Sequence, residues 1–178
     1  MARPKRNLYE YAWYHAMNRG NNHQDIFFDL EDRNMFLAIL DHITDKYEIE
    51  IHSFCLMTNH YHLLIHTPEA NLDKAMQYLN GVYTMRINRK YERDGQLFRG
   101  RYTSKEVKKD GYFIWTSKYI HSNPVDAGIV KNPLNYPWSS YKYFITECEK
   151  PKWVHTNKIL ECFGAIDPVS EYRKFVET

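Results

Sequence analysis

Two histidines separated by one residue are the first feature of this sequence that could do chemistry. His60-Tyr61-His62 follows a Thr58-Asn59 turn and begins an apolar run. Side chains in a strand alternate between its faces, so His60 and His62 point the same way. From one face, two imidazoles can converge on one metal ion. The alternative is a pair of exposed histidines with ordinary hydrogen bonds.

A tyrosine and an asparagine form the second feature. Tyr119 and Asn123 stand four residues apart in the segment YIHSNP, so they would share one face of a helix. Asn123 could complete a metal site as a third ligand and aim Tyr119 at the ion. The alternative is an aromatic packing residue followed by an Asn-Pro pair that ends the helix.

Basic residues gather in one stretch although the net charge is only +2. Between residues 86 and 101, the two acidic residues Glu92 and Asp94 are outnumbered by basic ones, which are Arg86, Arg89, Lys90, Arg93, Arg99 and Arg101. Such a stretch can follow a phosphate backbone, and the 15 tyrosines could stack on unpaired bases. In a strand over 97–102, Arg99 and Arg101 would project together as a phosphate clamp. A solvated helix face, a solvated edge strand and aromatic core residues are the alternatives.

Composition limits the possible classes of protein. The 178 residues are 43% hydrophobic and 26% charged, which is typical of one ordinary domain with a core. No run of eighteen apolar residues predicts a membrane span, and no apolar stretch behind the basic N-terminus predicts a secretory signal. The three cysteines are scattered, so we expect reduced thiols, a cytoplasmic location and no zinc knuckle. There is also no Gly-rich phosphate loop of the Lys-Ser/Thr kind.

The periodicity predicts the elements that position these residues. Strands are expected over 12–18, 49–57, 60–65 and 97–102, with a loop at 18–22. Helices are expected from Asp29 or Asp32, from Asn71 towards Arg89, and from Asp110 through Tyr119 until Pro124. This order predicts an α+β fold of the ferredoxin-like or RRM-like split β-α-β type, an antiparallel sheet with helices on one face. Residues 1–178 would be a single domain, with extra C-terminal helices and 145–178 as an extension.

Five segments resemble, in order, the single-tyrosine transposases of the HUH superfamily, especially the REP-associated tyrosine transposases. They are YHAMNRGNN (14–22), CLMTNHYHLLI (55–65), QLFRGRY (96–102), YIHSNPV (119–125) and YPWSSY (136–141). The chain departs from the family pattern at Thr58, where proline is usual, and at Asp126, where a basic residue is common. Neither position is a proposed ligand.

The resemblance implies a role for each residue of the site. Tyr119 would be the nucleophile, and His60, His62 and Asn123 would hold Mg²⁺ or Mn²⁺. Lys118, His121 or metal-bound water could accept the tyrosine proton. The loop at 18–22 would recognise bases beside a DNA hairpin. The DNA-binding residues we expect are Asn18, Arg19, Asn21, Asn22, Arg86, Arg99 and Arg101.

The implied activity is that of a metal-dependent endonuclease and strand transferase for single-stranded DNA. It would form a 5′-phosphotyrosine at sites flanking a hairpin made by a palindromic repeat, as a monomer or homodimer away from membranes. Two other readings stay open at this point. One is a non-catalytic hairpin DNA- or RNA-binding module with an RRM-like fold. The other is a hydrolase that uses metal-activated water.

Overall fold

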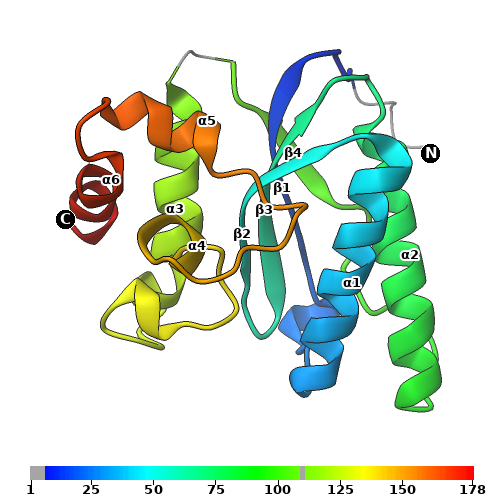
Figure 1. The fold of residues 1–178 in the computed structure, drawn as a ribbon. Helices are drawn as coiled ribbons and strands as arrows, with labels where there is room; N and C mark the ends of the chain where they lie inside the picture. The colour runs from blue at the N-terminus through cyan, green and yellow to red at the C-terminus, as the bar shows by residue number, and fades with distance from the viewer. Residues whose placement is uncertain (1–6, 109–110) are drawn as a thin grey trace.

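Four strands form one antiparallel sheet in the order β2-β3-β1-β4 in the computed structural model, which describes residues 7–108 and 111–178 (Figure 1). They are β1 (Ala12–Arg19), β2 (Glu50–Leu56), β3 (His60–Thr67) and β4 (Thr103–Glu106). Along β1, Tyr14, Ala16 and Asn18 are buried on one face while the residues between them turn to the other. The first three strands thus confirm the predicted ones.

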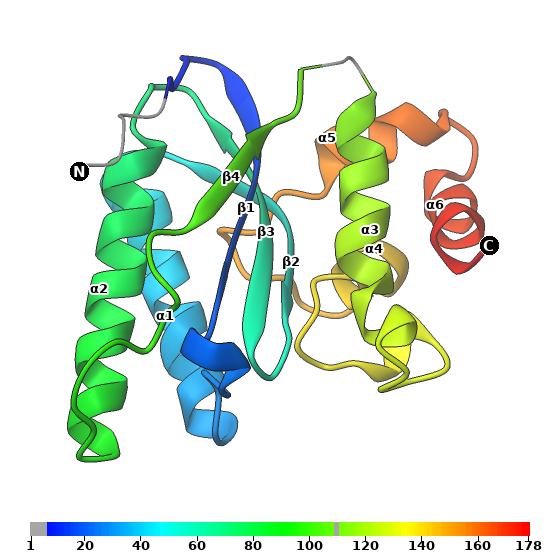
Figure 2. The same cartoon turned by 180° about the vertical axis from the view of Figure 1, so that it is seen from behind.

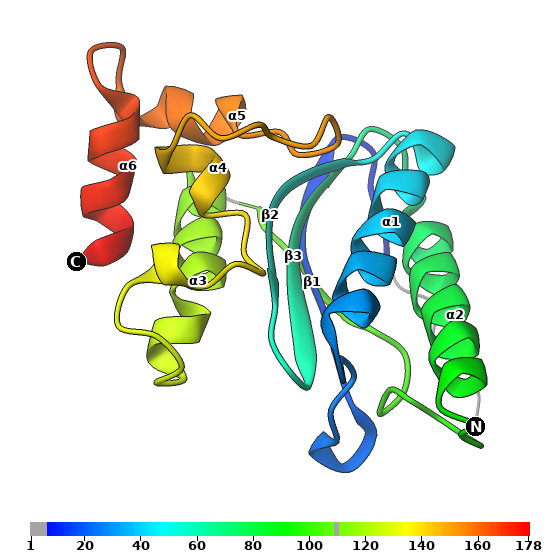
Figure 3. The ribbon, with the colours of Figure 1, turned by 60° about the horizontal axis from the view of Figure 1, so that its bottom comes forward.

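Two long helices cover one face of the sheet (Figure 3). They are α1 (Leu30–Tyr47) and α2 (Leu72–Lys90). A capping box starts α1, because the Asp29 side chain accepts a hydrogen bond from the Asp32 amide and the Asp32 side chain accepts one from the Asp29 amide. Tyr61, Leu63 and Ile65 pack beneath these helices in the main hydrophobic core, as the alternation along β3 predicts.

The third helix lies on the other face of the sheet. α3 (Tyr112–Asp126) packs against β2 and β3, with the C-terminal segments around it (Figures 2 and 3). The α+β fold with its antiparallel sheet is confirmed, but helices cover both faces. The reason is that β2 and β3 carry apolar residues on both sides: Cys55 and Leu64 join Ile120 of α3 in a second core.

The remaining elements are short and follow α3 in the chain, apart from one 3-10 turn after β1. They are η1 (Asn21–His23), η2 (Pro133–Asn135), α4 (Lys142–Ile145), α5 (Asn157–Leu160), η3 (Glu161–Phe163) and α6 (Pro168–Glu177). No helix in the described residues is long and apolar enough to cross a membrane.

Two boundaries differ from the prediction, and one predicted cap cannot be compared. The strand expected over 97–102 forms later, at Thr103–Glu106, because Leu97, Phe98 and Tyr102 are all buried in the main core instead of alternating between two faces. Pro124 does not end α3, which continues to Asp126. Proline has no amide hydrogen to donate, but the amides of Ala127 and Gly128 still donate to the carbonyls of Asn123 and Val125, so the helical turn continues past it. The predicted cap Asp110 lies outside the described residues.

A chain of buried hydrogen bonds holds α3 in place. The Ser117 hydroxyl lies 2.6 Å from the Ser53 hydroxyl of β2 and 2.6 Å from the Tyr172 hydroxyl of α6. His121 contacts Tyr172 through Nδ1 and the Ser140 hydroxyl through Nε2, both at 2.7 Å. The residues after 145 therefore help to fix the helix that carries Tyr119.

Replacing His121 with alanine should lower the free energy of unfolding by about 2–4 kcal/mol at pH 7, because two buried hydroxyls each lose one partner and a buried ring is removed. Burial lowers the pKa of His121 to about 3. The neutral ring therefore stabilises the fold fully above pH 6.5, and this contribution is lost as the pH falls towards 3.

Urea denaturation at pH 7 and pH 4.5 would measure the effect. The difference between the unaltered chain and His121→Ala should shrink at the lower pH. The exposed His42 of α1 provides the control, since His42→Ala should change stability by less than about 0.5 kcal/mol. An equal difference at both pH values would contradict the assignment.

Candidate active site

The predicted histidine pair lies at the start of β3 on the α3 side of the sheet. His62 is buried and His60 is half-buried, with 5.0 Å between their ring centroids. The side chain of Asn59 fixes the first ring, because its Oδ1 lies 2.7 Å from Nδ1 of His60. The two imidazoles share a face, as the alternation predicts.

α3 brings Tyr119 and Asn123 to the same place. The Tyr119 ring meets the His62 ring edge-on, with 5.4 Å between centroids, and the tyrosine is 49% exposed. The Asn123 side chain is a neighbour of His62 and partly opposes the lowering of that histidine's pKa. The Nδ2 of Asn123 donates to the Tyr119 carbonyl at 2.6 Å. The structure thus assembles all four residues singled out in the sequence: His60, His62, Tyr119 and Asn123.

A third histidine, which was not among the predicted site residues, also lies at this site. His15 of β1 lies opposite Leu64 of β3, and its Nε2 is 2.9 Å from Nδ1 of His62. Its ring also meets Tyr119 edge-on at 5.6 Å between centroids. In a strand over 12–18, alternation places His15 on the same face as Trp13 and Met17. Only the pairing of β1 with β3 shows that this is the face of the histidine pair.

The site keeps its imidazoles neutral. Burial, together with the neighbouring His15 and His60, lowers the pKa of His62 to about 3. Burial, with Lys105 nearby, lowers the pKa of His15 to about 4, and burial lowers that of His60. Neutral rings keep a lone pair for a cation. Two neutral imidazoles and an amide oxygen therefore suit a divalent ion, and the contact with His15 fixes the orientation of one of them.

The residues suggested as proton acceptors are engaged elsewhere. His121 is buried and both of its ring nitrogens contact hydroxyls. The Lys118 ammonium donates to the Phe175 carbonyl of α6 at 2.6 Å. Neither group is a free base beside Tyr119, so their roles are structural.

A second group of metal-binding side chains lies near the other end of β3. Suitable ligand atoms of Glu50, His52 and His66 all fall within 4.8 Å of one another. Oε2 of Glu50 also lies 3.1 Å from the Lys158 ammonium. A cation already occupies that carboxylate, which weakens its attraction for a metal ion. His52 lies at a β-bulge between Ile51 and Ser53, where the pairing of β2 with β3 shifts its register. Regular alternation along a strand does not predict such a shift.

The loop residues expected to bind DNA differ in how far their side chains are exposed to solvent. The Asn18 side chain is buried, and its Nδ2 donates to the Gly100 carbonyl at 3.2 Å. Arg19 and Asn21 are half-buried. Asn22 is exposed, in a left-handed backbone conformation with φ 49°. Asn18 therefore braces the loop, while Asn22 presents its amide to solvent.

The three arginines expected to contact phosphate are all exposed. Arg86 lies on α2. Arg99 and Arg101 line a groove of about 930 Å³ between α2 and the segment 96–102. The groove also contains amide side chains, those of Gln77, Asn80 and Gln96. Its charge and polarity suit a phosphate backbone.

Comparison with known proteins gives three findings. The family described as IS200-like transposases matches residues 9–123. A curated relative from Haemophilus influenzae, named as a REP-associated tyrosine transposase, is 25% identical over 119 residues, which cover 61% of this chain and 68% of the relative. A solved structure of a REP-associated tyrosine transposase bound to a REP hairpin superposes with a TM-score of 0.70. That likeness, at 16% identity, covers 87% of this chain and 92% of the other and shows the fold.

Gly20 precedes the exposed loop and cannot be replaced without moving it. A Cβ at residue 20 would lie 1.9 Å from the backbone oxygen of Gln24. Gly20→Ala should therefore lower the free energy of unfolding by about 1–3 kcal/mol. Gly81 of α2 is the matched control, because nothing lies within 4 Å of a Cβ there. Gly81→Ala should raise stability by about 0.5–1 kcal/mol. Urea denaturation of both variants tests this, and a neutral Gly20→Ala would contradict it.

Proposed function

The chain belongs to the IS200-like transposase family, whose members cut and rejoin DNA. We propose that it is a metal-dependent endonuclease and strand transferase that acts on single-stranded DNA. One observation carries the proposal: α3 holds the exposed Tyr119 over the buried His62, with 5.4 Å between their rings. A nucleophile and neutral metal-binding groups thus meet at one open site. All of these side chains come from a single chain, so the proposal needs no residue of a second copy.

The neutral rings of His60 and His62, with the Asn123 amide, would hold Mg²⁺ or Mn²⁺. Oxygen-rich completion of the coordination by phosphate and water suits both ions. When bound, the ion neutralises charge on the scissile phosphate and its transition state. His15 acts on this site through His62, whose Nδ1 it contacts at 2.9 Å, so it is a positioning residue.

Tyr119 attacks the phosphorus of the scissile phosphodiester through its phenolic oxygen. A bond forms between that oxygen and phosphorus, and the bond from phosphorus to the 3′ oxygen breaks. The phenol gives up its proton and the departing 3′ oxygen takes one up, so the products are a 5′-phosphotyrosine and a free 3′-OH. In the second step a 3′-OH attacks the same phosphorus and releases the tyrosine. The number of phosphoester bonds is conserved, so rejoining requires no nucleoside triphosphate.

The proposed substrate is single-stranded DNA beside a hairpin. The chain's fold matches that of a transposase solved with a REP hairpin, and exposed arginines lie on the same molecule as the site. Arg99 and Arg101 would contact the hairpin backbone in their groove, with Arg86 nearby on α2. Arg19, Asn21 and Asn22 would meet bases at the loop, and Asn18 would support it from within.

Tyr119→Phe should abolish the covalent adduct with DNA, lowering its rate by at least about 1000-fold, because phenylalanine has no oxygen to attack phosphorus. The substrate is a pool of hairpin oligonucleotides with randomised, labelled single-stranded flanks, incubated with Mn²⁺ or with EDTA. A denaturing gel then separates free DNA from DNA linked to protein.

The same gel separates the other candidate activities. If the strand is cleaved without forming an adduct, and this cleavage persists in Tyr119→Phe, the protein is a hydrolase that uses water. Tight hairpin binding with no cleavage in any condition would identify a binding module. Tyr11→Phe is the control, since it alters a 76% exposed tyrosine that lies in neither the groove against α2 nor the one against α3 and does not contact the histidine pair.

Removal of one histidine from each metal-binding group should identify the catalytic one. His62→Ala should lower Mn²⁺ affinity by at least about 100-fold, since a ligand is lost. His66→Ala should leave both Mn²⁺ affinity and adduct formation within about twofold. Electron paramagnetic resonance of free Mn²⁺ measures the affinity. The opposite pattern would assign the ion to Glu50, His52 and His66.

A further inference from the structure

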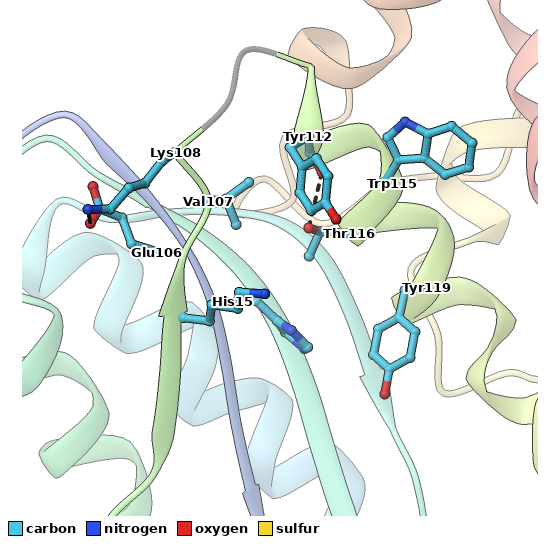
Figure 4. Close-up of a pocket in the computed structure, with 9 residues that line it drawn as sticks. His15, Glu106, Val107, Lys108, Tyr112, Trp115, Thr116 and Tyr119 are labelled. Carbon is cyan, nitrogen blue, oxygen red and sulfur yellow. Dashed lines mark hydrogen bonds and ion pairs between the residues drawn. The ribbon is translucent and has the colours of Figure 1, made fainter.

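A second groove begins at the active site and runs between β4 and α3. It encloses about 610 Å³ and is lined at one end by His15 and Tyr119. Figure 4 shows Tyr112 and Trp115 on α3 above them, with Val107 on the facing segment. The groove therefore extends from the proposed nucleophile towards the start of the helix.

Three aromatic side chains on the α3 wall of this groove are left in solvent. Tyr112, Trp115 and Tyr119 are 51%, 55% and 49% exposed. Their spacing of three and four residues places them on one face of the helix. The Trp115 ring rests edge-on against Phe175 of α6, with 4.7 Å between centroids. That contact orients the indole while half of its surface stays open, an arrangement that suits stacking on a flat partner.

The β4 wall supplies positive charge next to the nucleophile. Lys105 is exposed and lies opposite His15 in the strand pairing, so the two side chains share the active-site face. Glu106 also lines the groove, but its carboxylate lies 3.3 Å from the Lys108 ammonium, and Figure 4 shows this pair turned away from α3. The groove therefore combines a cation with flat aromatic surfaces.

We propose that this groove binds the unpaired nucleotides next to the scissile phosphate, with Trp115 and Tyr112 stacking on bases and Lys105 contacting the backbone. The inference rests on the proposed function, because it takes Tyr119 as the point of attack. Aromatic rings beside a cation are the usual means of holding single strands without reading their sequence. The groove is also continuous with the site through His15 and Tyr119, so a strand lying in it reaches the nucleophile without a break.

Binding of two defined strands tests the stacking directly. Fluorescence anisotropy at low salt compares a labelled twelve-residue thymidine strand with a twelve-residue abasic strand of equal charge. Stacking should make the unaltered chain prefer the thymidine strand by roughly 5- to 100-fold. Trp115→Ala should remove most of that preference, and Tyr112→Ala should remove part of it. Lys105→Ala should weaken both strands alike, because it acts on phosphate.

Matched variants keep the test independent of folding. Trp115→Phe retains a ring against Phe175 and should keep most of the preference, whereas Trp115→Ala should lose it. Phe28→Ala removes a 41% exposed aromatic that precedes α1 and packs against Tyr91, away from this groove, and it should leave the preference unchanged. Thermal melting shows which variants fold.

Two results would overturn the inference: no preference in the unaltered chain, or a preference that survives in both Trp115→Ala and Tyr112→Ala. If these variants change the oligomeric state in solution but not the preference for the thymidine strand, the aromatic face would instead be a contact between two copies of the chain. The adduct assay judges the proposed function separately. If an adduct forms but the thymidine strand is not preferred, only the groove proposal is wrong. If the thymidine strand is preferred but no adduct forms, only the proposed attack by Tyr119 is wrong.

Discussion

The hydroxyls of Ser53 and Ser117 meet at 2.6 Å in a buried contact that joins β2 to α3. The position of the tyrosine depends on this contact and on the bonds continuing from it through Tyr172 and His121. Buried hydroxyl and imidazole groups lose stability when left unpaired, so the helix has one favoured position on the sheet. That position places Tyr119, two residues beyond Ser117, over the histidines of β3. The residues after 145 contribute Tyr172, so they support the helix that carries Tyr119.

Local periodicity predicted which of the candidate site residues share a face, and the family resemblance supplied the roles proposed for them. His60 and His62 share a face because a strand alternates, and Tyr119 and Asn123 share a face because a helix repeats every 3.6 residues. The α+β class, the hairpin of β2 and β3 and the capped start of α1 follow from similarly local signals. These predictions needed no knowledge of how elements that are distant in sequence pack together.

The features that the sequence did not reveal all depend on long-range pairing. His15 joins the site only because β1 pairs with β3. The side of the sheet chosen by α3 depends on apolar residues such as Leu64, whose partners lie far along the chain. The fourth strand begins after Tyr102 because the preceding apolar residues enter the core together, a choice that alternation alone cannot predict. The segment 96–108 then lines two grooves, an arginine-bearing one against α2 and an aromatic one against α3.

Mass spectrometry of the linked peptide tests the central claim most directly, that α3 places Tyr119 for attack on DNA. The adduct formed with Mn²⁺ is digested with nuclease and then with trypsin, which leaves a nucleotide remnant on the reacting side chain. We expect this remnant on the peptide that begins at Tyr119, after Lys118, and on no other of the 15 tyrosines. A remnant on any other residue would contradict the account, because the helix would then hold Tyr119 at the histidine pair for a reason other than catalysis.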